Sequence, residues 1–348
     1  MSTDHAPAPL ELAEVLDPTW LNGALAARFP GVQVAGTTIT EQITTMATKV
    51  RFHVDYDAQC GAPNDLCVKG YFLEPGRANP SMGAKETLFY EQLAADLPVR
   101  VPDCIYGGTD PVTRHSIIIM EDLVAKGCTF LSALSPYTPA QVAGSLDQLA
   151  SMHAATWGNQ RLMALPWLTP SLEMMLNHVT PERLQELLDG PRGEGLPRDV
   201  LDGSRLRAAI VKISGSTLAG ATCLVHGDAH AGNLFQTSDG QAGIVDWQIL
   251  QMGSWGIDVA YHIGAVLDTA DRERSERDLL RSYLDRLLAS GVEPPSWDEA
   301  WTNYRIGLAY GLFLWGITIR VDPPIINAFV GRLGSAVAQH GSLDLLGV

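Results

Sequence analysis

Hydrophobic and polar residues alternate along several short stretches in the first third of the chain. A period of two, with Val, Ile and Thr frequent, is typical of strands that bury one face. The last stretch ends in the continuous apolar run S-I-I-I-M, which is typical of a buried central strand. The pattern predicts strands at residues 31–40, 47–54, 66–72, 102–107 and 115–120. The first two form a hairpin whose loop is residues 41–46.

Two segments of the same region have the period of a helix. Residues 18–29 follow Asp17, which suits an N-cap, and begin with a proline, which suits the first helical position. Residues 81–97 carry apolar side chains at helical spacing and end before a proline. Residues 1–17 show neither pattern, and we expect a loosely ordered lead-in.

Beyond residue 122 the pattern becomes mainly helical. Two short helices are expected within residues 170–188, broken at Thr180-Pro181, and a loop follows from Pro191. We therefore expect an N-terminal lobe at residues 1–122 and a C-terminal lobe at residues 123–348. The longer predicted helices are residues 138–157, 199–217, 255–268, 296–320 and 322–339.

The stretch C-L-V-H-G-D-A-H-A-G-N-L-F, followed after a polar turn by G-I-V-D-W-Q, concentrates polar residues between short apolar runs. The runs predict two strands, and the glycines predict a loop at residues 226–233. Asp228, Asn233 and Asp246 can then converge. Carboxylate and amide oxygens are ligands that suit Mg²⁺, and an Asp, an Asn five residues later and a further Asp match the needs of phosphoryl transfer.

Two other interpretations of this stretch stay open. Asp and Asn beside Gly are common turn formers, so each residue alone has a structural explanation. His226 and His230 could bind zinc with Asp228, as in a metal-dependent hydrolase. The glycines oppose the helix that an H-E-x-x-H site needs, and its Glu is missing. We expect His226 to brace the loop.

Composition and charge narrow the classes of function. Lys and Arg number 24 against 39 Asp and Glu, a net charge of −15, which disfavours a nucleic-acid partner. An acidic surface suits cationic substrates, but solubility is the favoured explanation of the charge. Residues 271–278 alternate in sign and predict a solvated helix face.

Targeting and redox features point to the cytoplasm. The N-terminus lacks the basic start and apolar core of a signal peptide, and no run approaches the ~18 apolar residues of a membrane span. The five cysteines are odd in number and lack C-x-x-C spacing, so the sequence indicates neither a disulfide framework nor a zinc ribbon.

The motif H-G-D-x-H-x-x-N, followed by a strand and D-W-Q, resembles the catalytic loop and metal-binding segment of the aminoglycoside phosphotransferase and choline kinase superfamily. Gln248 in place of Glu resembles the ecdysteroid-kinase-like branch. The resemblance implies an α+β, two-lobed protein-kinase-like fold, with an antiparallel sheet and one main helix in the small lobe and a larger helical lobe. It also implies ATP and Mg²⁺ as cofactors.

In this superfamily the catalytic Asp accepts the hydroxyl proton, and the resemblance gives that role to Asp228 and metal binding to Asn233 and Asp246. It further implies that Lys69 holds the ATP phosphates and is paired with a Glu of the following helix. Glu86 is the expected partner and Glu91 its competitor, about 140° further round the helix. Taken alone, Lys69 could equally be a solvent-facing lysine of an edge strand.

The remaining nucleotide contacts are also implied by the resemblance. The hairpin loop has no glycine, unlike the G-x-G-x-x-G of protein kinases, so Thr44 and Thr45 are the candidates for phosphate contacts. Met120, Glu121 and Leu123 would form the hinge against the adenine. Asp258 would cap or buttress the catalytic loop. His153 is expected to be a core histidine.

The sequence thus predicts an ATP- and Mg²⁺-dependent kinase acting on a hydroxyl of a small organic molecule. Aminoglycoside-like, amino alcohol, macrolide-like and steroid-like acceptors stay open, and aromatic residues of the last helices serve either the core or the acceptor pocket. A nucleotide-binding pseudokinase and a metal-dependent hydrolase are the alternatives. We expect no membrane partner, and the oligomeric state is not indicated.

Overall fold

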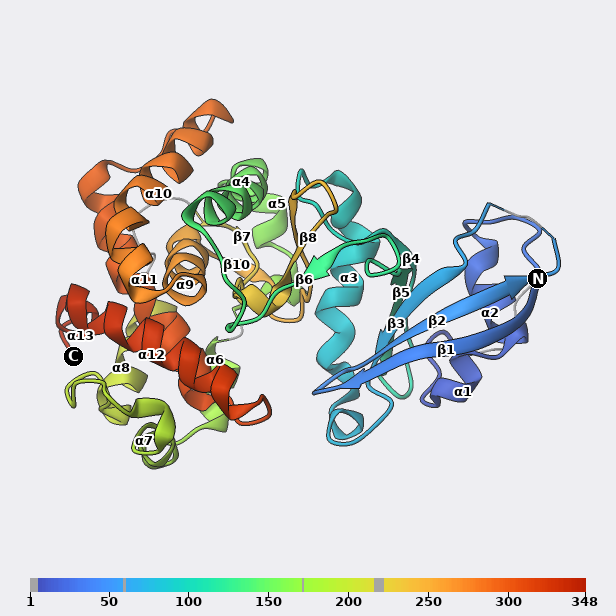
Figure 1. Cartoon of the computed structure of the whole chain (residues 1–348), viewed down its shortest axis with the longest axis horizontal. Helices are drawn as coiled ribbons and strands as arrows, with labels where there is room; N and C mark the ends of the chain where they lie inside the picture. Colours follow the sequence, from blue (N-terminus) through green and yellow to red (C-terminus); the bar gives the residue numbers. More distant parts are fainter. Residues whose placement is uncertain (1–5, 59–60, 171, 216–221) are drawn as a thin grey trace. The chain divides into compact units, whose positions relative to one another are not determined.

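The computed structural model describes residues 6–58, 61–170, 172–215 and 222–348 and divides into two compact units. The first contains the residues up to 96 together with 101–129, and the second contains residues 97–100 and 130–348 (Figure 1). The division falls later than the predicted boundary after residue 122. The Asp122 N–H donates to the Asp65 carbonyl of the first unit at 3.0 Å, and the next residues form a turn in which the Cys128 N–H donates to the Leu123 carbonyl at 2.9 Å.

A five-stranded antiparallel sheet with the order β1-β2-β3-β5-β4 forms the first unit. Alternation of apolar residues fixes its register, because Val50, Phe52 and Val54 of β2 are all buried on one face. The strands are β1 (Val34–Thr44), β2 (Thr48–Tyr56), β3 (Asp65–Gly70), β4 (Cys104–Thr109) and β5 (Ser116–Glu121). All five predicted strands are present, with shifted ends.

The hairpin between β1 and β2 is tighter than predicted. Residues 41–44 continue β1, and Thr44 pairs with Thr48. The Thr45 N–H donates to the Ala47 carbonyl at 2.9 Å, so the turn is residues 45–47 instead of 41–46. β-Branched residues on both sides of the turn favour extended backbone, which is why the strands run further.

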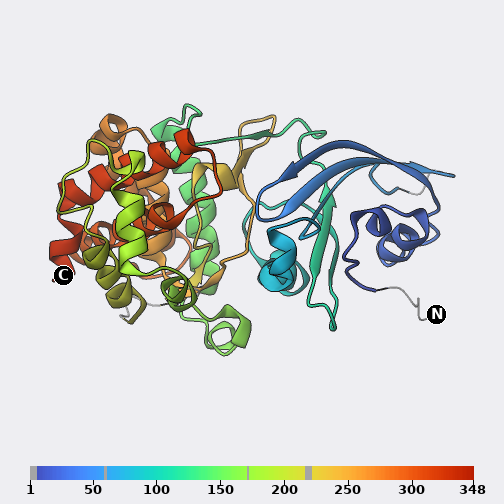
Figure 2. The same ribbon diagram turned by 90° about the horizontal axis from the view of Figure 1, so that it is seen from below.

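Short helices cover one side of this sheet (Figure 2). Asp17 accepts a hydrogen bond from the Thr19 N–H and caps α2 (Pro18–Ala26), as predicted, although the helix ends before the expected residue 29. The expected loose lead-in is wrong for its described part. Residues 12–15 form α1 (Leu12–Val15), and Val15 is buried in the same core.

The predicted helix at residues 81–97 is broken into pieces. Its α-helical part is α3 (Ala84–Gln92), preceded by the 3₁₀ turn Pro80–Gly83 and followed by the 3₁₀ turn Ala94–Asp96. A further 3₁₀ turn is Gly76–Ala78. Gly83 takes the N-cap position without a side-chain hydrogen bond, so the helix begins later than the periodicity indicates.

Helices dominate the second unit. Thr138 and Gln141 form a capping box at the start of α4, and Ser296 and Glu299 form one at the start of α11. The helices are α4 (Pro139–Thr156), α5 (Gln160–Met163), α6 (Leu172–His178), α7 (Pro181–Leu188), α8 (Gly203–Gly215), α9 (Trp255–Val266), α10 (Thr269–Ala289), α11 (Trp297–Ile317), α12 (Pro323–His340) and α13 (Ser342–Leu345). The predicted break at Thr180-Pro181 is confirmed.

Several ends of these helices differ from the predictions. Helix α8 begins at Gly203 instead of residue 199, and its predicted end at Thr217 lies outside the described residues. Helix α9 ends at Val266 instead of residue 268, and α11 ends at Ile317 instead of residue 320. Short 3₁₀ turns occur at Pro166–Leu168 and, within the predicted loop, at Pro191–Gly193. No helix of the described segments combines the length and apolar character needed to cross a membrane.

Small strands complete the second unit and frame the predicted catalytic stretch. β7 (Thr222–Val225) pairs antiparallel with β10 (Gln251–Ser254), and β8 (Leu234–Gln236) pairs antiparallel with β9 (Ala242–Ile244). β6 (Thr129–Phe130) falls where the chain passes from the first unit to the second. Residues 226–233 form the predicted loop between β7 and β8, with a 3₁₀ turn at Ala231–Asn233.

The predicted fully solvated face of α10 is wrong at two positions. Arg272 and Glu276 lie one turn apart and are 0% and 4% exposed. The Arg272 guanidinium donates to Glu276 at 2.6 Å, and Tyr304 and His340 contact the same carboxylate. Tyr304 of α11 and His340 of α12 pack against α10 at this point, so Arg272 and Glu276 are buried instead of facing solvent.

Candidate active site

Lys69 lies inside the sheet of the first unit. β3 runs between β2 and β5, and the Lys69 side chain is only 4% exposed, so the edge-strand alternative is wrong. Its Nζ lies 2.6 Å from the Glu86 carboxylate of α3, which is equally buried. Glu86, and not the exposed Glu91, is therefore the partner of this lysine. A buried ammonium requires such a partner because desolvation of an unpaired charge is expensive.

The predicted hinge residues follow the end of β5. The Glu121 N–H already donates to the Asp103 carbonyl at 3.1 Å, and the Glu121 carboxylate lies 2.6 Å from Lys126. Leu123 is buried, and Met120 is half-buried. The Glu121 N–H is thus already bonded within the first unit, and so is the Asp122 N–H, which donates to the Asp65 carbonyl at 3.0 Å.

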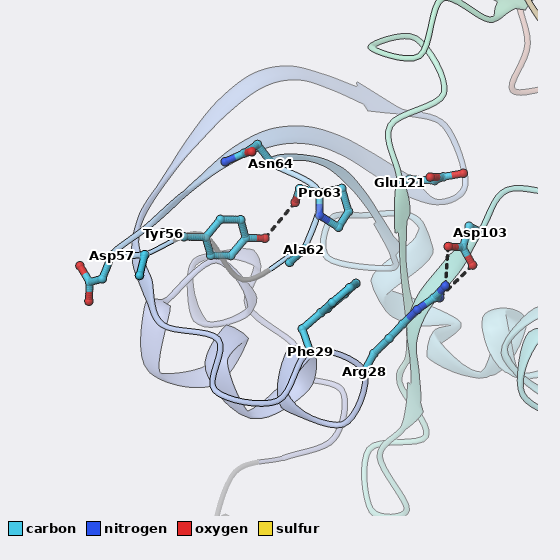
Figure 3. Close-up of a pocket in the computed structure, with 11 residues that line it drawn as sticks. Arg28, Phe29, Tyr56, Asp57, Ala62, Pro63, Asn64, Asp103 and Glu121 are labelled. Carbon is cyan, nitrogen blue, oxygen red and sulfur yellow. Dashed lines mark hydrogen bonds and ion pairs between the residues drawn. The ribbon is translucent and has the colours of Figure 1, made fainter.

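An open pocket of about 760 Å³ lies elsewhere in the first unit, and Figure 3 shows its lining. Arg28 spans one side and binds Asp103 through two hydrogen bonds of 2.8 and 2.6 Å, while Phe29 and Tyr56 supply the rings. Among the predicted site residues, Glu121 is the one that lines it. The pocket therefore does not coincide with the predicted chemistry.

In the second unit, hydrogen bonds fix the predicted catalytic Asp228. The Tyr261 hydroxyl donates to its Oδ1 at 3.0 Å, and Asn233 Nδ2 donates to its Oδ2 at 3.1 Å and to its carbonyl at 2.9 Å. Its own N–H donates to His226 Nδ1 at 3.1 Å. The carboxylate is therefore held in one orientation, although its side chain remains 32% exposed.

The electrostatics keep Asp228 ionised. Burial acts to raise the pKa of its carboxyl, but His230 and His226 outweigh burial, so the pKa lies below the usual value of 3.8. Burial and the Asp228 carboxylate raise the pKa of Tyr261 well above 10.0, so its hydroxyl keeps the proton that it donates. Near neutral pH the carboxylate can accept a proton.

Asp246 follows the end of β9, two residues after Ile244. The Val245 N–H donates to the Asn233 carbonyl at 2.9 Å, which ties the end of β9 to the loop. Asp246 is close enough to act on the pKa of Asp228. Its φ of 69° is the left-handed conformation, which costs roughly 1–2 kcal/mol for a residue with a Cβ. Such outliers gather at functional sites.

The oxygen donors of this cluster fit a magnesium ion. Asn233 Nδ2 donates to Asp228, so the amide oxygen is the atom of Asn233 that could bind a metal. Asp246 adds a carboxylate. A hard cation that binds few protein oxygens and keeps waters suits this donor set.

The zinc alternative does not fit the hydrogen bonds. His226 Nε2 bonds the Val245 carbonyl at 3.0 Å and its Nδ1 accepts from Asp228, so both ring nitrogens are engaged. His230 Nδ1 accepts from the Gly232 N–H at 3.0 Å. Within the described parts of the chain, no group of three His, Cys, Asp or Glu side chains could hold a metal. His226 thus links the Asp228 backbone to the Val245 carbonyl at the end of β9.

Asp258 of α9 supports the loop from below. Its carboxylate accepts the His226 N–H at 2.7 Å and the Gly227 N–H at 2.8 Å, and His153 Nε2 lies 3.2 Å away. All are buried. The Asp258 carboxylate therefore holds two consecutive backbone groups of the loop, while the N-cap of α9 is Ser254. His153 is a core histidine, as predicted.

Gly227 is required at its position. Its φ of +80° is left-handed, and a Cβ there would lie 2.8 Å from the Ile249 carbonyl oxygen. The Tyr310 hydroxyl also donates to the Gly227 carbonyl at 2.6 Å. Both polar backbone groups of Gly227, the residue before Asp228, are therefore hydrogen-bonded within the protein.

The sequence did not reveal that Tyr261 contacts Asp228, or that Trp315 in turn contacts Tyr261. Trp315 Nε1 donates to the Tyr261 hydroxyl at 2.6 Å, which in turn donates to Asp228. Tyr261 follows Asp258 in the stretch G-I-D-V-A-Y, and its closeness to Asp258 was the available signal. Trp315 lies in α11, among aromatic residues for which the sequence pattern left open a role in the core or in the acceptor pocket.

The fold is shared with solved phosphotransferases. A candidate aminoglycoside phosphotransferase from Ralstonia eutropha has 15% identity and a TM-score of 0.50, with 94% of this chain and 97% of that chain covered. Choline kinase from Cryptosporidium parvum has 12% identity and a TM-score of 0.54, covering 94% and 95%. Choline kinase from Streptococcus pneumoniae has 11% identity and a TM-score of 0.51, covering 92% and 98%. At these identities the likeness establishes the fold, and it confirms the predicted α+β kinase-like class.

Sequence comparison identifies the family. No curated protein sequence gives a significant match. The sequence profile of the phosphotransferase enzyme family matches residues 66–299, which include Lys69, Glu86 and the whole of the Asp228 loop. This match spans more than half of the chain, and the chain therefore belongs to the phosphotransferase enzyme family.

Proposed function

We propose that this small-molecule kinase transfers the γ-phosphate of ATP, with Mg²⁺, to a hydroxyl of a small organic acceptor. The observation that carries the proposal is the fixed Asp228 carboxylate, with Asn233 bonded to it and Asp246 beside it. Phosphoryl transfer needs such an acceptor of the hydroxyl proton together with oxygen ligands for the metal.

In this proposal Asp228 orients the acceptor hydroxyl and accepts its proton late in an in-line transfer. The new bond joins the hydroxyl oxygen to the γ-phosphorus, the bond from that phosphorus to the bridging oxygen breaks, and ADP leaves with the electron pair. Asn233 and Asp246 would bind Mg²⁺, which neutralises phosphate charge when bound. Positioning supplies most of the rate because the transition state is loose.

The first unit would bind the nucleotide. Lys69, held by Glu86, would contact the α- and β-phosphates, and Thr44 and Thr45 at the hairpin turn would offer further phosphate contacts. Met120, Glu121 and Leu123 would face the adenine. A pseudokinase is disfavoured because the residues assigned to catalysis, metal binding and phosphate binding are all present in the sequence.

The acceptor class is part of the proposal. Aminoglycoside-like, amino alcohol, macrolide-like and steroid-like hydroxyls are the candidates, and Gln248 favours the ecdysteroid-kinase-like branch. Two of the related structures are choline kinases and one is a candidate aminoglycoside phosphotransferase, which supports a search that begins with amino alcohols and aminoglycosides.

A screen for acceptor-dependent ADP release across these four classes tests the proposal. We expect Mg·ATP to raise the melting temperature, because a ligand at 100 times its Kd stabilises the folded state by about 2.7 kcal/mol. One acceptor class should accelerate ADP release. Asp228→Ala should abolish this release and still bind Mg·ATP. The proposal is contradicted if Mg·ATP leaves the melting temperature unchanged. It is also contradicted if the Asp228→Ala variant keeps its turnover.

A further inference from the structure

His230 carries its ring proton on the nitrogen that faces Asp228. Its Nδ1 accepts a hydrogen bond from the Gly232 N–H at 3.0 Å, so Nδ1 bears no proton. In a neutral imidazole the proton then resides on Nε2. Nε2 is the nitrogen nearest Asp228, at 3.6 Å from Oδ2. The loop backbone therefore sets the tautomer.

Aromatic packing fixes the direction of this N–H. The ring centroid of His230 lies 5.1 Å from that of Trp315 and 5.3 Å from that of Phe329, with interplanar angles of 78° and 64°. Trp315 and Phe329 stack on each other at 4.2 Å and are buried. With these rings beside it and Gly232 bonded to Nδ1, the imidazole has little freedom to turn.

The gap between His230 and Asp228 can hold one oxygen atom. A separation of 3.6 Å is too long for a direct hydrogen bond, whereas an oxygen can lie about 2.7–3.0 Å from both groups. Oδ2 accepts one hydrogen bond, from Asn233, and keeps a second lone pair. The His230 and Asp228 side chains are 14% and 32% exposed, so a ligand can reach both.

We propose that His230 is a second catalytic residue, whose Nε2–H donates a hydrogen bond to the oxygen of the acceptor hydroxyl. This inference rests on the proposed function. The hydroxyl oxygen would have four neighbours: its carbon, the proton that passes to Asp228, the His230 N–H, and the γ-phosphorus. When the carbon, the proton and the His230 N–H occupy three directions around the hydroxyl oxygen, its remaining lone pair points at the γ-phosphorus. The gain is in orientation, which dominates in a loose transition state.

Two conservative substitutions separate this role from a structural one. In His230→Asn the amide oxygen replaces Nδ1 as acceptor for Gly232, but the donor toward Asp228 is lost. In His230→Gln the amide nitrogen reaches the position of Nε2 and keeps the donor, but the Gly232 contact is lost. If His230 only braces the loop, the Asn variant should keep more activity than the Gln variant. If His230 donates to the acceptor hydroxyl, the Gln variant should keep more activity than the Asn variant.

The rate of ADP release from Mg·ATP is measured in two conditions. In one, water is the only acceptor, and in the other the alcohol that gives the fastest release is added. We expect His230→Asn to lower kcat by about 10- to 100-fold and His230→Gln to stay within about threefold of wild type. The Kd of Mg·ATP should be unchanged in both variants. Equal rates for the two variants, or a better rate for Asn than for Gln, overturn the inference.

A measurement on the unaltered protein does not depend on the folding of the variants. Nitrogen-15 NMR of histidine-labelled protein reports the tautomer, and we expect His230 to carry its proton on Nε2. A proton on Nδ1 contradicts the inference. Asp228→Asn separates the two proposals. If it keeps turnover, the proposed base is wrong, and if it loses turnover while His230→Asn does not, only the role of His230 is wrong.

Discussion

At the residue scale, the buried ion pair of Lys69 and Glu86 combines stability with the proposed phosphate binding. Both side chains are 4% exposed, and their charged atoms lie 2.6 Å apart. Removing one member leaves a buried charge uncompensated, whereas replacing both with apolar residues is often neutral. The pair therefore allows a test in which stability and catalysis respond differently.

We expect Glu86→Ala to lower the free energy of unfolding by about 3–5 kcal/mol, because Lys69 loses its partner. The double variant Lys69→Met/Glu86→Leu should regain most of that stability but not turnover. Urea unfolding and ADP release measure the two effects. Glu91→Ala on the same helix is the control and should change stability by less than about 1 kcal/mol. A double variant that recovers turnover excludes Lys69 from phosphate binding.

At the scale of elements, α9 and the catalytic loop form one buried unit. Asp258 accepts two consecutive loop N–H groups, and Tyr261, one turn further along α9, donates to Asp228. A short loop without regular hydrogen bonds therefore gains a defined shape from a helix that lies later in the sequence. The geometry of the proposed base depends on this helix as much as on its own loop.

Helix α10 supplies the prediction at this scale. Glu276→Gln should destabilise the protein by about 3 kcal/mol or more at neutral pH, because Arg272 remains buried and loses its nearer counter-charge, the Glu276 carboxylate at 2.6 Å. Glu273→Gln is the matched control and should change little, because the Glu273 carboxylate lies 3.7 Å from Arg272 and is 45% exposed. Thermal and urea unfolding of both variants measure the difference. Equal effects would mean that Arg272 does not depend on Glu276.

The pH dependence of the Glu276 contribution has a definite sign. Burial acts to raise the pKa of Glu276, but His340 and Arg272 outweigh it, so the pKa is below the usual value of 4.5. Stabilisation from a lowered carboxyl pKa is complete above the unfolded value and is lost as the pH falls through the folded one. The stability difference between wild type and Glu276→Gln should therefore shrink below about pH 4.5.

At the scale of the whole molecule, the four cysteines of the described residues are free thiols. Cys67, Cys104, Cys128 and Cys223 are free, while Cys60 lies outside the described residues. Burial raises the pKa of Cys67 to about 11 and that of Cys104 to about 12, and it raises the pKa of Cys223 well above its usual range. The thiolate is the reactive form, so these cysteines should react slowly.

We expect iodoacetamide at pH 8 to label Cys67, Cys104 and Cys223 of the native protein at least about tenfold more slowly than an unperturbed thiol of pKa about 8.5. Peptide mapping after timed labelling measures each site. The same protein in guanidinium chloride is the control, where all of them should react readily. Rapid native labelling of Cys67 or Cys104 would show that these strands open frequently.

The sequence by itself determined the class of fold and the centre of the site. Periods of two and 3.6 separated the sheet from the helical region, and H-G-D-x-H-x-x-N with D-W-Q marked Asp228, Asn233 and Asp246 as a group. These features are local, because a few neighbouring residues define them. The pairing of Lys69 with Glu86 also followed, but only through the resemblance to a family.

Only the tertiary structure decided which distant side chains complete the local motifs. Tyr261 of α9 contacts Asp228, and Trp315 of α11 contacts Tyr261. Tyr304 and His340 contact Glu276, which lies buried with Arg272. Contacts of this kind depend on how helices pack, which no local period encodes. For the same reason His230 remained an ambiguous histidine in the sequence, until Gly232 and two aromatic rings defined where its proton points.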